Sequence, residues 1–269
     1  MRIILLTGVN LRHRYFANRI AQECGDVVAV FREEEGPVCT SSEPTGERAE
    51  LDRAILRWHF GLRDRTEEML LGDVGDQWNQ EPGCELVTVK SEDLNTANVA
   101  QSLKSYSPDV VAVFGTSILR TPILGELNCL FLNLHLGLSQ YYRGVATNFW
   151  AIYNDELEYV GATIHLIDTG TDTGPILHQG RPEIVPDDDQ HTIGTKALIL
   201  GTDLMIKTLA ECREGRLKWR QATDKGRLYQ RRDFKPYHAR KLREKLNAGL
   251  IPRYIAQSRE LKSKVDIIQ

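Results

Sequence analysis

The stretch Asp109-Val110-Val111-Ala112-Val113-Phe114-Gly115 decides the fold of this 269-residue chain, and Leu130-Phe131-Leu132-Asn133-Leu134-His135 repeats its pattern. Each stretch is a short, continuous apolar run, which is typical of a parallel strand buried on both faces. Similar runs lie at Ile3–Leu6, Val27–Phe31 and Leu86–Val89. A helical pattern at Tyr15–Glu23 separates the first two of them, and strands that alternate with helices predict an α/β fold.

The predicted architecture is Rossmann-like, with a mostly parallel, twisted sheet and helices on both faces. Ala162–Ile167 and Ile176–Ile184 are expected to form an antiparallel hairpin at the sheet edge, because only Asp168–Pro175 separates them. Amphipathic spacing predicts helices over Glu50–Leu70 and Thr192–Leu209. The first of these helices is expected either to pack on the sheet or to form a wall over a substrate site.

Residues 1–210 are predicted to form one Rossmann-like domain, and residues 211–269 a basic C-terminal extension whose short helices dock on it. Arg213–Lys245 carries 13 basic and 4 acidic residues, although the whole chain has a net charge of −3. Three interpretations of this basic segment stay open: a landing place for an anionic ligand, a solvated helix face, or a subunit contact that makes the chain a homodimer.

The composition excludes several classes of protein. Hydrophobic residues make up 41% of the chain and charged residues 26%, which excludes disordered, collagen-like and coiled-coil chains. The longest apolar runs fall far short of the ~20 residues that span a bilayer, and no signal-peptide core follows Met1. We therefore expect a cytoplasmic protein without membrane contact. Five scattered cysteines and unclustered histidines favour neither a disulfide framework nor a metal site.

Two polar side chains interrupt the last of the parallel strands. Asn133 and His135 are two residues apart, so both project to one side of that strand. They stand at its carboxyl end, where open α/β sheets build their ligand crevices. Other residues with functional side chains are interpreted as structural: His59, His165, His178, His191, His238 and Trp150.

The turn of the predicted hairpin, Asp168-Thr169-Gly170-Thr171-Asp172-Thr173-Gly174-Pro175, holds two carboxylates around a glycine. By itself this is an ordinary aspartate-rich turn. Together with Asn133 and His135 it supplies a candidate acid/base partner for the imidazole. A carboxylate, an imidazole and an amide together suit acyl transfer.

Three ordered blocks resemble the folate-dependent formyltransferase family: Asn133-Leu134-His135, then Tyr142-Arg143-Gly144 with Trp150, then Asp172-Thr173-Gly174-Pro175-Ile176-Leu177. That family includes glycinamide ribonucleotide, methionyl-tRNA and sugar-nucleotide formyltransferases. The resemblance is close over residues 109–177 and looser over the earlier strands, and it makes residues 1–210 a formyltransferase catalytic domain. It implies transfer of a formyl group from 10-formyltetrahydrofolate to an amine, with no metal required.

The resemblance also implies that Asn133, His135 and Asp172 form the catalytic triad. Amine attack on the formyl carbon develops negative charge on oxygen and positive charge on nitrogen. Asn133 is therefore expected to donate to the oxyanion, while His135 donates or accepts a proton and Asp172 relays protons through water. Two folate-binding walls are implied, one formed by Ser117, Ile118 and Leu119 and one by Asp168, Thr169, Gly170 and Thr171. From the residues alone, the first wall is equally the start of a helix that packs on the core.

Three arginines are predicted to bind the acceptor. Arg12 and Arg14 stand at a presumptive helix N-terminus that suits an anion, although an exposed basic first turn explains them equally. Arg143 lies in the loop after His135, where its guanidinium either holds an acceptor phosphate or braces the loop.

The identity of the acceptor is inferred by elimination within the family. The segment after the first strand lacks the glycine-rich phosphate loop of the glycinamide ribonucleotide enzymes. Too little chain follows Leu209 for the C-terminal domain of methionyl-tRNA formyltransferases. A phosphorylated small amine, with a nucleotide-linked amino sugar as the leading candidate, is therefore the expected acceptor, and nucleic acid is not the expected partner.

Several alternatives stay open. Within the enzymes they are formyl transfer to an aminoacyl-tRNA or another amine and hydrolysis of formyltetrahydrofolate, although such hydrolases carry an N-terminal regulatory domain and the first strand here begins at Ile3. Outside the enzymes, the alternative is a folate-binding scaffold, against which the intact Asn133, His135 and Asp172 count. A nicotinamide-dependent oxidoreductase is not favoured, because no GxGxxG motif follows the first strand.

Overall fold

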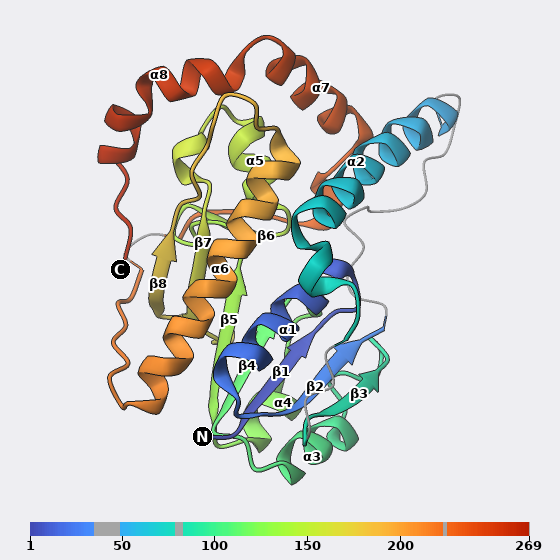
Figure 1. Cartoon of the computed structure of the whole chain (residues 1–269), viewed down its shortest axis with the longest axis vertical. Coiled ribbons are helices and arrows are strands. Elements are labelled where there is room, and N and C mark those ends of the chain that lie inside the picture. The colour runs from blue at the N-terminus through green and yellow to red at the C-terminus, as the bar shows by residue number, and fades with distance from the viewer. Residues whose placement is uncertain (35–48, 79–82, 223–224, 269) are drawn as a thin grey trace.

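The computed structural model of the chain describes residues 1–34, 49–78, 83–222 and 225–268 (Figure 1). Its central sheet consists of β1 (Ile3–Thr7), β2 (Val27–Glu33), β3 (Glu85–Val89), β4 (Val110–Phe114), β5 (Leu130–His135), β7 (Ala162–Leu166) and β8 (Ile176–Gly180). The spatial order is β3-β2-β1-β4-β5-β7-β8. Strands β1 to β5 run parallel, and β7 pairs antiparallel with both β5 and β8. The predicted mostly parallel sheet and its antiparallel edge hairpin are confirmed.

The remaining elements lie around this sheet. The helices are α1 (Leu11–Cys24), α2 (Ala49–Gly75), α3 (Ala97–Ser105), α4 (Thr121–Glu126), α5 (Thr147–Tyr153), α6 (Gln190–Arg213), α7 (Pro236–Asn247) and α8 (Leu250–Ser263), with 3₁₀ turns η1 (Leu157–Tyr159) and η2 (Arg231–Asp233). Two short strands, β6 (Tyr142–Gly144) and β9 (Arg227–Tyr229), form a separate parallel pair. Over the described residues, every helix is too short or too polar to cross a lipid bilayer.

Helices cover both faces of the sheet, as predicted. On one face α1 and α6 share a core with Ile3 and Leu5 of β1. On the other face α3 and α4 share a core with Ile4 and Leu6 of the same strand. Neighbouring residues of one strand thus enter opposite cores, which explains why the strand reads as a continuous apolar run.

Helix α2 and strand β8 end at residues other than those predicted. Helix α2 continues past the predicted end at Leu70 to Gly75, and it packs mainly against α1, α6 and α7 instead of on the sheet. Strand β8 ends at Gly180 and not at the predicted Ile184, because Pro182 follows and has no N–H to continue the strand pairing.

Helices α7 and α8 of the C-terminal segment arch over the end of the molecule that holds α5 (Figure 1). Helix α7 contacts α2 and α5, and α8 contacts η1. Trp150, Phe234 and Tyr254 belong to the apolar core that these elements share. Trp150 is only 4% exposed, which confirms its structural interpretation. The predicted boundary at residue 210 falls inside α6, which continues to Arg213.

Candidate active site

A cavity of about 990 Å³ lies at the carboxyl ends of the central strands. Strands β1 and β4 are neighbours in the sheet, but β2 follows on the outer side of β1 and β5 follows on the outer side of β4. The connections from β1 and β4 therefore run in opposite directions, which makes the point between these two strands a topological switch point of the sheet. Open α/β sheets bind their ligands at such points. Residues after β1, at the end of β4 and at the end of β5 all line the cavity, among them Asn10, Phe114, Asn133 and His135.

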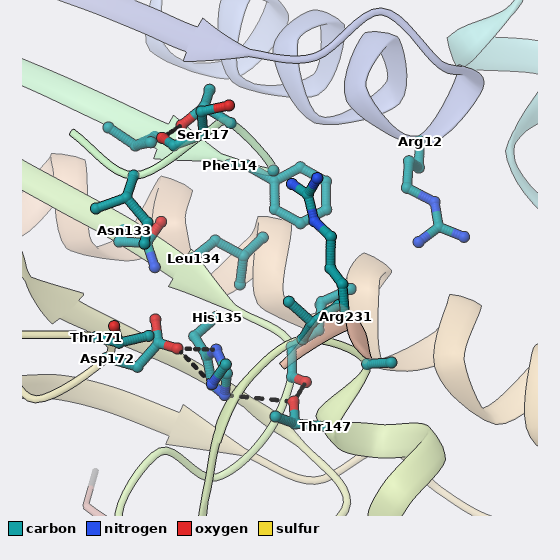
Figure 2. Close-up of a pocket in the computed structure, with 18 of the residues that line it drawn as sticks. Arg12, Phe114, Ser117, Asn133, Leu134, His135, Thr147, Thr171, Asp172 and Arg231 are labelled. Atoms are coloured by element: carbon teal, nitrogen blue, oxygen red, sulfur yellow. Dashed lines mark hydrogen bonds and ion pairs between the residues drawn. The ribbon is translucent and has the colours of Figure 1, made fainter. Parts of the chain in front are cut away.

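Four side chains at one wall of the cavity form a continuous chain of contacts. Figure 2 shows three of them, Asn133, His135 and Asp172. Nδ2 of Asn133 lies 3.0 Å from Nε2 of His165. The Asp172 carboxylate lies between the two imidazoles, with Oδ1 3.5 Å from His165 Nε2 and Oδ2 3.3 Å from His135 Nδ1. The structure therefore brings the three predicted catalytic residues together and adds His165 to them.

His165 was interpreted as a structural histidine, and the structure places its ring in contact with Asn133 and Asp172. The ring is 3% exposed, and its Nδ1 lies 2.8 Å from the Leu166 carbonyl oxygen, so Nδ1 carries the proton. With the proton on Nδ1, Nε2 accepts a hydrogen bond from the Asn133 amide. Because an amide nitrogen has two N–H groups, Asn133 is oriented by one and keeps the other as a donor. Strand register produces this pair, since Asn133 of β5 faces His165 of β7.

Asp172 is held in a left-handed backbone conformation, with φ of 51°. Such a conformation is uncommon outside glycine and points to a carboxylate that the surrounding structure positions. The Gly144 N–H donates to Asp172 Oδ2 at 2.8 Å. Burial acts to raise the pKa of Asp172, but His135, His165 and the Gly144 N–H together hold it below its ordinary value. Asp172 is therefore a carboxylate at neutral pH.

His135 faces two acceptors. Its Nε2 lies 2.9 Å from the Tyr142 carbonyl oxygen and therefore carries a proton, whereas its Nδ1 faces Asp172. Burial lowers the pKa of His135, and the charge of Asp172 opposes that shift. In the neutral ring, the Nδ1 lone pair and the Asp172 carboxylate together form a place that can accept one proton.

The first predicted folate wall lines the cavity. Ser117, Ile118 and Leu119 all contribute to it. The Ser117 backbone N–H and hydroxyl both donate to the carboxylate of Glu33, over 2.7 and 2.6 Å, and Glu33 is completely buried at the end of β2. Sequence reasoning missed Glu33, whose only signal is an acidic residue directly after an apolar strand. Its carboxylate fixes the shape of this wall.

The second predicted wall also reaches the cavity. Asp168, Gly170 and Thr171 line it, whereas Thr169 does not. Asp168 Oδ1 accepts a hydrogen bond from the Gly170 N–H, at 2.9 Å, and another from the Thr173 hydroxyl, at 2.8 Å. This carboxylate shapes its own turn and leaves the wall to backbone groups.

Only one of the three predicted acceptor arginines lines the cavity. Arg12 does so and pairs with Glu67 of α2. Arg14 donates instead to the carbonyl oxygens of Gly75 and Val9. The Arg14 guanidinium thus ties α1 to the end of α2, and its acceptor-binding role stays a prediction.

Arg143 also differs from its predicted acceptor role. Its Nε donates to the Gly226 carbonyl at 3.1 Å and its Nη1 to the Thr171 carbonyl at 3.2 Å. Neither these atoms nor the rest of Arg143 belongs to the described lining of the cavity. The guanidinium braces the loop that carries Asp172, which is the second of the two readings left open by the sequence.

The structure also places His13 at the cavity. It lines the cavity, and burial is the main reason that its pKa falls to about 3, with neighbouring arginines adding to the shift. Its Nδ1 accepts from the Asn10 N–H, which starts α1 at Leu11 and not at the predicted Tyr15. A Cβ at Gly115 would lie 2.4 Å from His13 Nε2, so this ring fits between the ends of β1 and β4 only because glycine follows β4.

The end of the cavity opposite Asn133 and Asp172 is lined by residues that the sequence analysis interpreted as structural or did not consider. Helix α2 contributes His59, Phe60, Arg63 and Glu67, so this helix is a wall of the cavity, the second of its two predicted roles. The C-terminal segment contributes five more residues: Leu228, Tyr229, Gln230, Arg231 and Phe234. Among the described residues, His, Cys, Asp and Glu side chains form no group of three or more that could hold a metal ion.

Curated relatives and solved structures resemble this chain. A methionyl-tRNA formyltransferase of Thermodesulfovibrio yellowstonii is 36% identical over 134 residues, which is 49% of this chain and 43% of the relative. The match thus spans less than half the length of that relative.

Two solved structures share the fold. The glycinamide ribonucleotide transformylase 1 of Symbiobacterium toebii aligns with a TM-score of 0.56 and 18% identity over 82% of this chain and 94% of that chain. The Helicobacter canadensis N-formyltransferase, solved with folinic acid and dTDP-3-aminofucose, aligns with a TM-score of 0.52 and 17% identity over 87% of this chain and 73% of that chain. At these identities the structural likeness concerns the fold alone.

The family profile described as formyl transferase matches residues 1–209. That range contains the central sheet, the chain of contacts from Asn133 to His135 and both predicted folate walls. This chain therefore belongs to the formyl transferase family.

Proposed function

We propose that this protein transfers the formyl group of 10-formyltetrahydrofolate to the amine of a phosphorylated small acceptor, with a nucleotide-linked amino sugar as the leading candidate. The observation that carries the proposal is the contact chain Asn133–His165–Asp172–His135 at the carboxyl ends of β5 and β7. An oriented amide donor beside a carboxylate and a buried imidazole is the arrangement that acyl transfer to an amine requires.

The cavity suits a folate. Val113, Ile118 and Ile167 supply apolar surface for a flat ring, and backbone groups of Asp168–Thr171 and Gly115–Leu119 supply hydrogen-bonding edges. Glu33 holds the second of these segments rigid through Ser117. When bound, formyltetrahydrofolate supplies the activated formyl group.

The residues of this chain have separable roles in the proposed reaction. The free N–H of Asn133 donates to the formyl oxygen as negative charge develops on it. His135 Nδ1 and the Asp172 carboxylate lie 3.3 Å apart and accept the proton that the attacking amine loses. Thr147 lies 3.3 Å from His135 Nε2 and donates its own hydroxyl proton to the Leu136 carbonyl, which helps to fix the ring.

A small phosphorylated acceptor is favoured by the rest of the cavity. Beyond the catalytic wall the lining includes Arg12, Arg63 and Arg231, which suits an anionic group on the substrate. The Helicobacter canadensis neighbour was solved with a nucleotide-linked amino sugar, which supports the same class of acceptor for this chain.

Aminoacyl-tRNA is the second candidate acceptor. It is favoured by the curated relative, a methionyl-tRNA formyltransferase 36% identical to this chain over the matched segment. The basic segment Arg213–Lys245 is the surface on which such an acceptor would bind, because phosphate contacts dominate nucleic-acid affinity.

A calorimetric titration with 5-formyltetrahydrofolate, a stable analogue of the donor, tests the proposal first. We expect saturable binding at one molecule per chain. A formyl-transfer assay with amino-sugar nucleotides and with methionyl-tRNA then separates the two acceptors by the product that gains a formyl group. Absence of folate binding, or release of formate without any formylated amine, contradicts the proposal.

A further inference from the structure

One end of the cavity is rich in positive charge and in imidazole rings. This basic end is defined by Arg12 of α1, His59, Arg63 and Glu67 of α2, His191 of α6, and Arg231 of the C-terminal segment. Figure 2 shows Arg12 on the side of the cavity opposite Asn133 and Asp172, with Arg231 rising between them. The basic end is therefore separate from the catalytic wall but opens into the same space.

Two buried imidazole nitrogens at the basic end have no hydrogen-bond partner among the residues that the structure describes. They are Nδ1 of His59 and Nε2 of His191. The side chains are 5% and 7% exposed, and their ring centroids are 4.6 Å apart. Native proteins rarely leave buried polar atoms unpaired, and two adjacent cases in a cavity wall indicate a ligand that pairs with them.

The two rings are neutral. Burial is the main cause that lowers the pKa of each to about 3, and the nearby Arg63 adds to both shifts. A neutral imidazole offers one donor and one acceptor, so the pair can hydrogen-bond a polar ligand without adding charge. Positive charge at the basic end comes from the arginines alone.

The arginines outnumber the carboxylates at the basic end. Glu67 pairs with Arg12 and lies 3.8 Å from Arg63. Arg231 has no side-chain hydrogen bond or ion pair with the described residues, and it stands beyond residues 1–209, which match the family. Arg63 also donates from Nε and Nη2 to Oδ1 of Asp64, over 2.9 and 2.7 Å, so the three guanidinium groups face two carboxylates. One net positive charge remains beside the apolar rings of Phe149 and Phe234, which strengthens attraction for an anion.

We propose that the basic end binds the phosphate group of the acceptor, with Arg63 and Arg231 contacting the phosphate oxygens and with His59 and His191 hydrogen-bonding the polar group beside it. The inference rests on the proposed function, because the acceptor's amine must reach Asn133 in the same cavity. A diphosphate linkage and a sugar phosphate share this chemistry, so inorganic pyrophosphate is the probe.

Calorimetry of the full chain with pyrophosphate tests the arginines. We expect Arg231→Ala and Arg63→Ala each to weaken binding by about tenfold or more, since each removes a charge-assisted contact. Arg232→Ala is the matched control, because Arg232 is the exposed neighbour of Arg231 and does not line the cavity. Thymidine diphosphate and thymidine are two further ligands in this experiment. If a nucleotide carries the phosphate, thymidine diphosphate should bind tightly and thymidine weakly. Binding of pyrophosphate but not of thymidine diphosphate indicates that the acceptor is a simpler phosphate ester.

The histidines are tested by variants that keep or remove one nitrogen position. His191→Gln places an amide nitrogen near the position of Nε2 and should retain pyrophosphate binding, whereas His191→Phe should weaken it severalfold. Because Nε2 of His191 has no hydrogen-bond partner in the described part of the chain, His191→Phe should not lower the melting temperature by loss of a bond. If that variant fails to fold, the pair His59→Asn and His59→Leu asks the same question at Nδ1.

Failure of this inference and failure of the proposed function are distinguishable. Every variant is also titrated with 5-formyltetrahydrofolate, whose predicted walls lie away from the basic end. Lost pyrophosphate binding with intact folate binding supports the inference. Undetectable pyrophosphate binding at about 10 mM, or equal binding by wild type, Arg63→Ala and Arg231→Ala, overturns it whether or not folate binds.

Discussion

The backbone N–H of Gly144 donates a 2.8 Å hydrogen bond to Oδ2 of Asp172, the same oxygen that lies 3.3 Å from Nδ1 of His135. Gly144 has a φ of 90°, and a Cβ at this position would lie 2.0 Å from the Tyr229 carbonyl oxygen. Glycine therefore allows β6 to approach β9 and to present its N–H to Asp172 at once. Gly144, which has no side chain to take part in the reaction, thus positions the Asp172 carboxylate in the cavity.

We expect Gly144→Ala to destabilise the protein by about 3 kcal/mol, because it adds a steric clash to an unfavourable φ, and to lower kcat as well. Thermal unfolding and the formyl-transfer assay measure the two effects. Gly72→Ala in α2 is the control: nothing lies within 4 Å of its Cβ position, so helix propensity should leave it as stable as wild type or slightly more so. An unchanged melting temperature for Gly144→Ala would show that β6 and β9 tolerate separation.

Replacing Asp172 should stop most of the chemistry. Asp172→Asn keeps the shape of the side chain but removes the charge and the proton acceptor, so we expect kcat to fall by about a hundredfold or more. Asp168→Asn is the comparison, because this carboxylate bonds within its own turn, and its loss should raise the KM for the folate more than it lowers kcat. The reverse pattern would make Asp168 the catalytic carboxylate.

His165 should act through Asn133. His165→Phe removes the acceptor that orients the amide, and we expect kcat to fall by about tenfold while the KM for the folate changes little. His178→Phe is the matched change on β8, where the ring is paired with Glu211 and does not line the cavity. It should alter stability and leave kcat unchanged. Equal kcat values for the two variants would return His165 to a structural role.

Stability should fall at acid pH through buried neutral histidines. The pKa values of His13, His59 and His191 are lowered to about 3 in the folded protein against 6.5 in the unfolded chain, mainly by burial. Between these values the unfolded chain binds more protons, so the stabilisation is complete above about pH 6.5 and decreases as pH falls toward 3. From pH 6.5 to 5 each histidine contributes a loss of about 1–2 kcal/mol.

Urea unfolding at pH 7.5 and at pH 5 measures this loss. His191→Gln removes one titrating group, so the difference between the two pH values should shrink in that variant. A wild-type free energy of unfolding that is the same at both pH values would mean that these rings are protonated in the folded protein.

Arg143→Ala should affect turnover and stability together. The guanidinium bonds the carbonyls of Thr171 and Gly226, so its loss loosens the loop that carries Asp172. We expect a lower melting temperature and a lower kcat with little change in the KM for the acceptor. Arg231→Ala provides the contrast, since it should raise that KM. A selective rise in the acceptor KM for Arg143→Ala would restore its predicted role as a phosphate ligand.

Local patterns were sufficient for the sheet and for the placement of Asn133 and His135 at one strand end. Continuous apolar runs identified β1 to β5, and alternation placed Asn133 and His135 on one side of β5. His165 was not recognisable, because its contact with Asn133 depends on the antiparallel register of β5 and β7, which no local pattern fixes. The resemblance supplied Asp172, and the structure adds the reason that Asp172 and not Asp168 reaches the imidazoles: its left-handed φ.

Local patterns were not sufficient to predict which arginines line the cavity. Arg12 and Arg14 at a presumptive helix N-terminus and Arg143 in a loop were all predicted to bind the acceptor, yet Arg14 and Arg143 donate to backbone carbonyls. Arg231 had no motif around it and reaches the cavity only because β9 pairs with β6. Which guanidinium meets a ligand is decided by contacts between segments distant in the sequence.

The pairing of β6 with β9 also has a consequence for biosynthesis. A ribosome completes the loop with Asp172 and the whole sheet well before it adds Gly226, whose carbonyl accepts from Arg143, and Tyr229, against which β6 packs. During that interval the nascent chain has its central strands but not the last wall of its cavity. A premature stop after α6 should therefore leave a product that retains the sheet sequence but lacks β9 and the Gly226 carbonyl, which support β6 and the loop that carries Asp172.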